Sequence, residues 1–136
     1  MKKSKQGSHT VDELCPCGTG QRYAACCARW HEGAEHLQAP TAQALMRSRY
    51  SAFVKENATY LLDTWHASTR PASMDFEPGL KWLGLEVKSQ TALTHENEAE
   101  VEFVARARQK DGRAFRQHER SRFLKEKDQW FYVAGV

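Results

Sequence analysis

All cysteines of the chain lie within thirteen residues, at Cys15, Cys17, Cys26 and Cys27. Four thiols this close form either disulfides or a metal site, and the redox compartment decides between the two. The first ten residues, MKKSKQGSHT, contain no apolar run, and no later run approaches the roughly 18 apolar residues of a membrane span. We therefore expect a cytoplasmic protein whose reduced cysteines bind a metal.

The spacing of the cysteines favours zinc. Two pairs of thiols flank a segment of eight residues, and four sulfur donors suit a tetrahedral zinc ion. Because four sulfurs leave no open position on the ion, we predict one structural zinc held by all four cysteines and no catalytic metal. The alternative is that His9, His31 or His36 replaces Cys27 as the fourth ligand.

At 136 residues the chain fits one compact domain with an appendage. Residues 1–38 are too few to bury a core of their own, so a structural zinc is the natural substitute for one. We predict that residues 1–38 form a zinc-binding arm, that residues 39–136 form the main domain, and that the Cys26–Cys27 pair begins a short helix.

Two helices are expected after the arm. Apolar residues recur at spacings of three and four up to Val54, which predicts a helix that begins at Pro40 and Thr41. Arg49 lies beside the apolar stripe of this helix, where an arginine is expected to be a buried ion-pair partner. Asn57 is a predicted cap for a second, short helix that carries Tyr60, Leu61 and Trp65 and ends before Arg70.

Apolar and charged residues then alternate to the end of the chain, as in antiparallel strands. Asp111–Gly112 is a typical hairpin turn. Two helices followed by such a meander predict an α+β fold, a cone in which helices pack on one face of a curved antiparallel sheet. The strands are expected at about 82–93, 98–109, 114–125 and 130–134.

The register of the hairpin decides which side chains face the apolar residues Val101, Phe103 and Ala105. A two-residue loop places Arg122, Arg120 and His118 opposite them, and a three-residue loop places Phe123, Ser121 and Glu119 there. Polar groups enter the inner face in either register. We expect an ion-pair network, for instance between Glu119 and Arg49 or Arg47, and the alternative is a pocket for an anionic or planar ligand.

The cysteine segment reads CPCGTGQRYAACC and resembles the SEC-C motif of the bacterial preprotein translocase motor ATPase. On this resemblance the four cysteines fall on zinc-ligand positions, and Gly18, Gly20 and Tyr23 fall on turn and packing positions. In that ATPase the motif binds zinc and contacts the export chaperone and the ribosome. The resemblance implies a docking module with a protein or ribosome partner.

Nearly the whole chain resembles the YchJ-like bacterial family. The segments that carry the resemblance are LMRSRYSAF at 45–53, YLLDTWH at 60–66, WLGL at 82–85 and ERSRFL at 119–124. The family implies a cone of the cystatin-like or nuclear-transport-factor-like type after the zinc motif. Many members carry a second SEC-C motif near the C-terminus, and the sequence up to Val136 contains one motif.

Three classes of function are open. The favoured one is a non-catalytic interaction module that docks through the SEC-C-like motif. The second is an enzyme or small-molecule binder that uses the interior of the cone. Its acid–base candidates are Asp63, His66, Asp75, His118 and Glu119.

The third class, nucleic-acid binding, is not expected to be the main function. One zinc and four thiolates would lower the formal net charge from +3 to +1, which leaves little overall attraction for phosphates. The basic candidates are Lys2, Lys3, Lys5 and Arg22, with the pairs Arg47/Arg49 and Arg120/Arg122.

Overall fold

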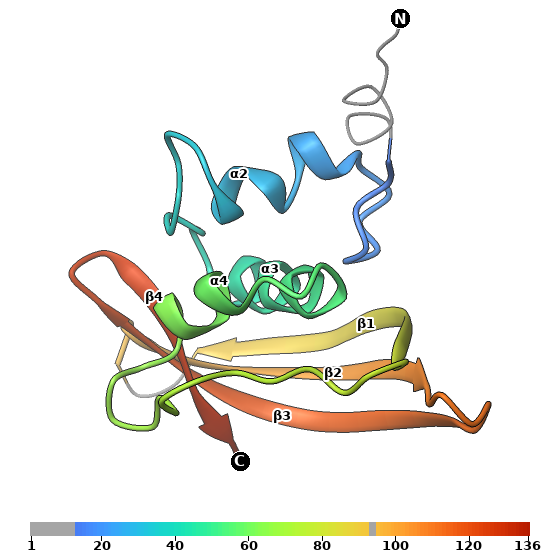
Figure 1. The fold of residues 1–136 in the computed structure, drawn as a ribbon. Helices are drawn as coiled ribbons and strands as arrows, with labels where there is room; N and C mark the ends of the chain where they lie inside the picture. The colour runs from blue at the N-terminus through green and yellow to red at the C-terminus, as the bar shows by residue number, and fades with distance from the viewer. Residues whose placement is uncertain (1–12, 93–94) are drawn as a thin grey trace, which may run out of the picture.

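A computed structural model describes residues 13–92 and 95–136 (Figure 1). Four strands form one antiparallel sheet in the order β1-β2-β3-β4, with the helices on one side of it. The predicted α+β fold with helices on a curved sheet is confirmed. The elements are a 3-10 turn η1 (Tyr23–Ala25), the helices α2 (Ala28–His31), α3 (Ala42–Val54) and α4 (Ala58–Asp63), and the strands β1 (Lys81–Ala92), β2 (Glu98–Arg108), β3 (Ala114–Glu126) and β4 (Gln129–Gly135).

Side-chain caps begin both main helices, and the cap at Asn57 is the one that the sequence predicts. The Ala44 amide donates to the Thr41 hydroxyl at 3.0 Å, and the Tyr60 amide donates to the Asn57 side chain at 3.1 Å. The second helix is shorter than expected, because Trp65 lies beyond its end and forms an isolated parallel bridge with Tyr132. Backbone bonds to β4 therefore replace the last predicted turn of the helix.

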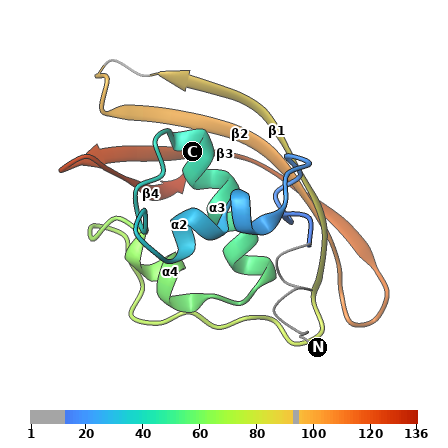
Figure 2. The same cartoon turned by 90° about the horizontal axis from the view of Figure 1, so that it is seen from above.

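The sheet curves around α3 and buries one face against the helices (Figure 2). Along β2 the residues Val101, Phe103 and Ala105 are buried, whereas the glutamates on either side of Val101 are only partly buried. The alternation is interrupted at Val104, which is fully buried as well. Two irregularities in the pairing of β1 with β2 add to the curvature. The core between the layers includes Leu45, Leu61 and Phe123.

Neither expected hairpin register is correct. Compared with the observed pairing of β2 and β3, the register expected for a two-residue loop is shifted by one residue, and the one expected for a three-residue loop is shifted by two. Gln109 pairs with Arg113 around a three-residue loop, and the amide of Gln109 donates to the Arg113 carbonyl at 2.8 Å. Gly112 closes this loop with a φ of 94°, a conformation that favours glycine. Opposite Val101, Phe103 and Ala105 lie Ser121, Glu119 and Gln117, so polar groups do enter the inner face.

The arm lies over α3 on the side away from the sheet (Figure 1). Its Trp30 is buried and belongs to the same hydrophobic cluster as Leu45 of α3. In the part of the chain that is described, no helix is both long and apolar enough to cross a bilayer. The boundary between arm and cone at residue 38 stays a prediction, since the arm packs against the cone.

Candidate metal centre and central cavity

Short backbone contacts bring the two cysteine pairs together. We call residues 13–27 the knuckle. The amide of Cys15 donates to the Gln21 carbonyl and that of Tyr23 to the Glu13 carbonyl, both at 2.8 Å, so the chain folds back on itself. Gly18 and Gly20 allow the turn with φ values of 86° and 85°. Beyond the turn the chain continues into α2, which begins directly after Cys27 as predicted.

The four sulfur atoms form one buried cluster. They all lie within 4.8 Å of one another, and the Cys17 and Cys26 sulfurs are 3.6 Å apart. A tetrahedral ion with zinc–sulfur bonds of ~2.3 Å would place its ligand atoms about 3.8 Å apart. The cluster therefore fits a metal ion with only small adjustments of the side chains.

The histidine alternative finds no support among the described residues. Both ring nitrogens of His31 are engaged: Nε2 donates to the Ser48 carbonyl at 2.8 Å, and Nδ1 accepts from the Tyr23 hydroxyl at 2.6 Å. His36 is exposed and lies outside the sulfur cluster. His9 lies outside the described residues, so the four cysteines are the candidate ligands that the structure brings together.

Hydrogen bonds among the thiols set their acidity. The bond from Cys17, followed by one from Cys27, lowers the pKa of Cys15. The same bond to Cys15 raises the pKa of Cys17 to about 11, and hydrogen bonding to Cys15 raises the pKa of Cys27 as well. The negative charge is thus favoured on Cys15 over Cys17 and Cys27, and a bound cation would favour the thiolate form of its ligands.

The knuckle rests on α3 through polar contacts. Arg47 Nη1 donates to the Cys17 carbonyl at 2.7 Å, and the Cys15 sulfur lies 3.4 Å from the Ser51 hydroxyl. The predicted ion pair between Arg47 and Glu119 is therefore wrong, because Arg47 turns toward the knuckle and away from the sheet. One face of α3 thus carries the cysteine cluster.

His31 makes the docking of the arm dependent on pH. Burial lowers the pKa of His31 below its ordinary 6.5, so the unfolded chain binds a proton there more readily than the folded chain. The stabilisation from the neutral ring is complete above pH 6.5 and is lost as the pH falls from there toward the folded pKa. We expect an NMR titration of the His31 ring to show a midpoint below 6.5, with faster hydrogen exchange of the arm amides over the same range.

The control is His31→Gln, whose amide can still donate to the Ser48 carbonyl but does not titrate. Protons also compete with a metal for the cysteines, so the pH dependence left in this variant reports the metal centre. The difference in pH dependence between the unmodified protein and this variant gives the contribution of His31. A midpoint at or above 6.5 would contradict a buried neutral ring.

A cavity of about 310 Å³ lies between α3 and the inner face of the sheet. Its aromatic walls are Tyr50, Phe53, Trp65, Trp82, Phe103 and Tyr132. Its polar lining is Arg49, Gln117, Glu119 and Ser121. The spacing of residues along the chain does not predict that Tyr132 or Trp82 lines this cavity. Their positions depend on the curvature of the sheet, which brings the strands around α3.

Arg49 is 4% exposed and makes no ion pair within the described residues, so the predicted pair with Glu119 is wrong. Its Nη1 donates to the Leu61 carbonyl at 2.8 Å and to the Thr64 hydroxyl at 2.7 Å. Its guanidinium carbon lies 4.6 Å from the ring centroid of Tyr132. Burial lowers the pKa of Arg49 to about 10, which leaves the side chain charged at neutral pH.

The acid–base candidates are scattered. Only Glu119 lines the central cavity, where it accepts hydrogen bonds from Gln117 and Ser121. Asp63 and Asp75 are exposed, and His118 pairs with Glu102 on the outer face. The described residues therefore place no acid–base pair of these candidates in one site.

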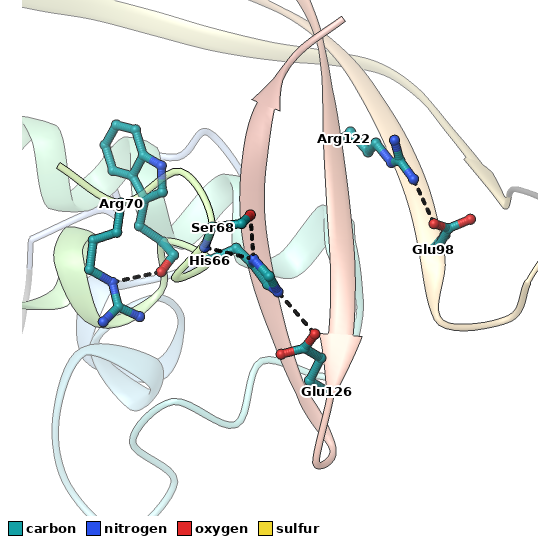
Figure 3. Close-up of polar contacts among 7 residues, drawn as sticks. His66, Ser68, Arg70, Glu98, Arg122 and Glu126 are labelled. Carbon is teal, nitrogen blue, oxygen red and sulfur yellow. Dashed lines mark hydrogen bonds and ion pairs between the residues drawn. The ribbon is translucent and has the colours of Figure 1, made fainter.

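His66 takes part in a local turn (Figure 3). Its Nδ1 accepts from the amide and hydroxyl of Ser68, and its Nε2 donates to Glu126 at 2.9 Å. These contacts hold the loop after α4 against β3.

The basic pair of β3 is neutralised by glutamates of β2. Arg122 donates to Glu98 at 2.7 Å (Figure 3), and Arg120 lies between Glu100 and Glu102. Lys2, Lys3 and Lys5 lie outside the described residues. Both arginines of this pair are therefore engaged in ion pairs with the neighbouring strand.

Comparison with known proteins agrees with both parts of the structure. The model of the YchJ middle NTF2-like domain matches residues 41–135, and the SEC-C motif matches residues 13–29. A UPF0225 protein of Polaromonas naphthalenivorans is 54% identical over 133 residues, which cover 89% of this chain and 95% of the relative.

Two solved structures are similar over most of the chain. The solution structure of a SEC-C motif containing protein from Rhodopseudomonas palustris has a TM-score of 0.78 at 30% identity and covers 90% of this chain and 96% of that one. The crystal structure of another, from Psychrobacter arcticus, has a TM-score of 0.76 at 30% identity, with 92% and 82% covered. The chain therefore belongs to the YchJ-like UPF0225 family, in which it joins a SEC-C motif to an NTF2-like cone.

Proposed function

We propose that the protein is a cytoplasmic zinc protein that docks a partner through its knuckle without catalysis. The observation that supports this most is the cluster of four buried sulfurs, all within 4.8 Å of one another. Soft thiolate donors favour zinc over the harder magnesium and calcium ions. When bound, the zinc would hold the knuckle folded, and four sulfurs would leave it no open position for a substrate.

The docking surface that we propose is the side of the knuckle that does not touch α3. Leu14 is 64% exposed there and pairs with Arg22 in an isolated antiparallel bridge. Thr19 and Gln21 are exposed beside them. An apolar side chain next to a basic one suits a protein surface, either free or on the ribosome.

Co-sedimentation with purified ribosomes tests both parts of the proposal. The protein is purified without added zinc, its metal content is measured, and its pelleting is compared with that of Leu14→Asp. We expect about one zinc per chain in both proteins, and about tenfold less of the variant in the pellet, as for loss of an interface anchor.

The matched control is Leu83→Asp, which changes an exposed leucine of β1 that is 41% exposed and lies outside the knuckle. It should sediment with ribosomes as the unmodified protein does. Equal losses in the two variants would contradict docking through the knuckle, and a protein without zinc would contradict the metal assignment.

A second candidate function, the binding of a small molecule in the cone, is favoured by the buried charge of Arg49 in the cavity. Catalysis is not proposed for this cavity. Within the described residues, no histidine and no second carboxylate lines it beside Glu119.

A further inference from the structure

We propose that the central cavity binds a small planar aromatic monocarboxylate, with its carboxylate on Arg49 and its ring between the aromatic walls. The proposal concerns the face of α3 that lies opposite the knuckle, and it does not depend on docking by the knuckle. Four observations support it: the unused donors of Arg49, its missing counter-ion, the shape of the walls and the position of Glu119.

The first observation is that part of the Arg49 guanidinium is unused. Nη1 donates both of its hydrogens, one to the Leu61 carbonyl and one to the Thr64 hydroxyl. Among the described residues, Nε and Nη2 have no acceptor, although every fully buried side-chain nitrogen and oxygen there has a partner. Neither atom is therefore completely enclosed by protein, and Arg49 lines the cavity. Their parallel N–H groups match the two oxygens of a carboxylate.

The second observation is the missing counter-ion. Arg49 is 4% exposed, and no carboxylate of residues 13–92 or 95–136 lies within ion-pair distance of it. The flanking rings of Trp65 and Tyr132, at 5.1 and 4.6 Å, compensate the charge only in part. A buried cation without a counter-ion is unfavourable, and a bound anion would remove much of this penalty.

The walls select a flat molecule. Trp65 and Tyr132 meet edge to face at 5.2 Å on one side, and Tyr50 and Trp82 do so at 5.7 Å on another. Such rings favour a planar aromatic group between them. The volume of about 310 Å³ lies at the lower end of the range for ligand pockets and suits one or two fused rings.

Glu119 limits the charge of the ligand. Gln117 is exposed and Glu119 is half-buried, so these residues mark the mouth of the cavity, whereas Arg49 lies at its buried end. One carboxylate at the mouth repels a dianion more strongly than a monoanion. A phosphate ester or a dicarboxylate is therefore a poorer ligand than a monocarboxylate.

Calorimetric titration of the intact zinc-loaded protein tests the ligand class. The probes are 2-naphthoate, its neutral analogue 2-naphthamide and the dianion 2-naphthyl phosphate. We expect 2-naphthoate to bind with a Kd at least about tenfold lower than those of the other two, as for one charge-assisted pair. Equal affinities for the acid and the amide would overturn the proposal, as would no binding of 2-naphthoate at millimolar concentration.

Variants at the mouth test the site, because Arg49→Met also removes contacts that hold α4 and could unfold the cone. Gln117→Glu adds a negative charge at an exposed position, and we expect it to weaken 2-naphthoate binding about threefold or more. Glu119→Gln removes a negative charge and should strengthen it by a similar factor. The control Gln38→Glu makes the same change at an exposed position away from the cavity. Equal effects of Gln117→Glu and Gln38→Glu, or no effect of Glu119→Gln, would place the ligand elsewhere and overturn the proposal.

Discussion

Replacing Cys17 by alanine is expected to abolish tight zinc binding and to unfold the arm while the cone stays folded. Cys17 is fully buried in the sulfur cluster, and its carbonyl accepts from Arg47, so the knuckle depends on its position. A structural zinc contributes an apparent ~10–16 kcal/mol to the folding of small zinc-finger peptides, which a segment of this length cannot replace by burial. The cone keeps its own core around Leu61 and Phe123.

Elemental analysis and amide NMR spectra measure the two effects of Cys17→Ala separately. Zinc should fall from about one equivalent per chain to a weakly held fraction, and the signals of the arm should collapse while those of the strands stay dispersed. The control is Ala25→Ser, which changes an exposed residue of η1. It should keep both the bound zinc and the dispersed signals of the arm. A Cys17→Ala protein that still held one equivalent of zinc tightly would contradict the ligand set, and loss of the strand signals would contradict the boundary at residue 38.

Phe123→Ala is expected to destabilise the arm and the cone together. Phe123 is fully buried, contacts Tyr132 at a centroid distance of 5.8 Å, and shares a hydrophobic cluster with Trp30 of the arm. Removing such a side chain costs about 3–5 kcal/mol, a large part of the roughly 5–15 kcal/mol that stabilises a typical domain. Urea unfolding of the zinc-loaded proteins measures the change as a lower midpoint with an unchanged slope.

The same strand offers the control for this prediction. Phe115 is 39% exposed near the hairpin, and Phe115→Ala should cost only about 1 kcal/mol or less. Similar losses for the two variants would mean that the inner face of β3 is not the core. A normal urea midpoint for Phe123→Ala would mean the same.

Local features were predictable from the sequence because their causes are local. Asn57 caps its helix through the amide three residues away, and the alternation along the first half of β2 follows from the geometry of a strand. The four cysteines are close in the chain, so a short turn suffices to cluster them. Their spacing alone indicated a metal site.

The lining of the cavity depended on the hairpin register, which the sequence left open. A three-residue loop that closes at Gly112 places Glu119 opposite Phe103, where Gln117 and Ser121 satisfy its carboxylate. Arg49 is thereby left without a counter-ion. A shift of one residue would have exchanged every side chain on this face, so the prediction of an ion pair had no firm basis.

The contacts between the arm and the cone could not be predicted from the sequence either, because they join residues far apart in the chain. The bond from Arg47 to the Cys17 carbonyl spans thirty residues, and that from His31 to the Ser48 carbonyl spans seventeen. Helical periodicity places Arg47 on the polar side of α3 but does not say what covers that side. The sequence alone therefore could not decide between Cys27 and a histidine as the fourth metal ligand.

The position of α3 between two layers restricts how this helix can vary. Of its thirteen residues eight are buried, among them the polar Ser48 and Ser51 on the side of the arm. Both side chains are small, which lets the knuckle approach the helix backbone closely, and a larger residue at either position would push the metal centre outward. Accepted changes in α3 are therefore expected to come with compensating changes in the arm or the sheet, so that the three layers evolve as one unit.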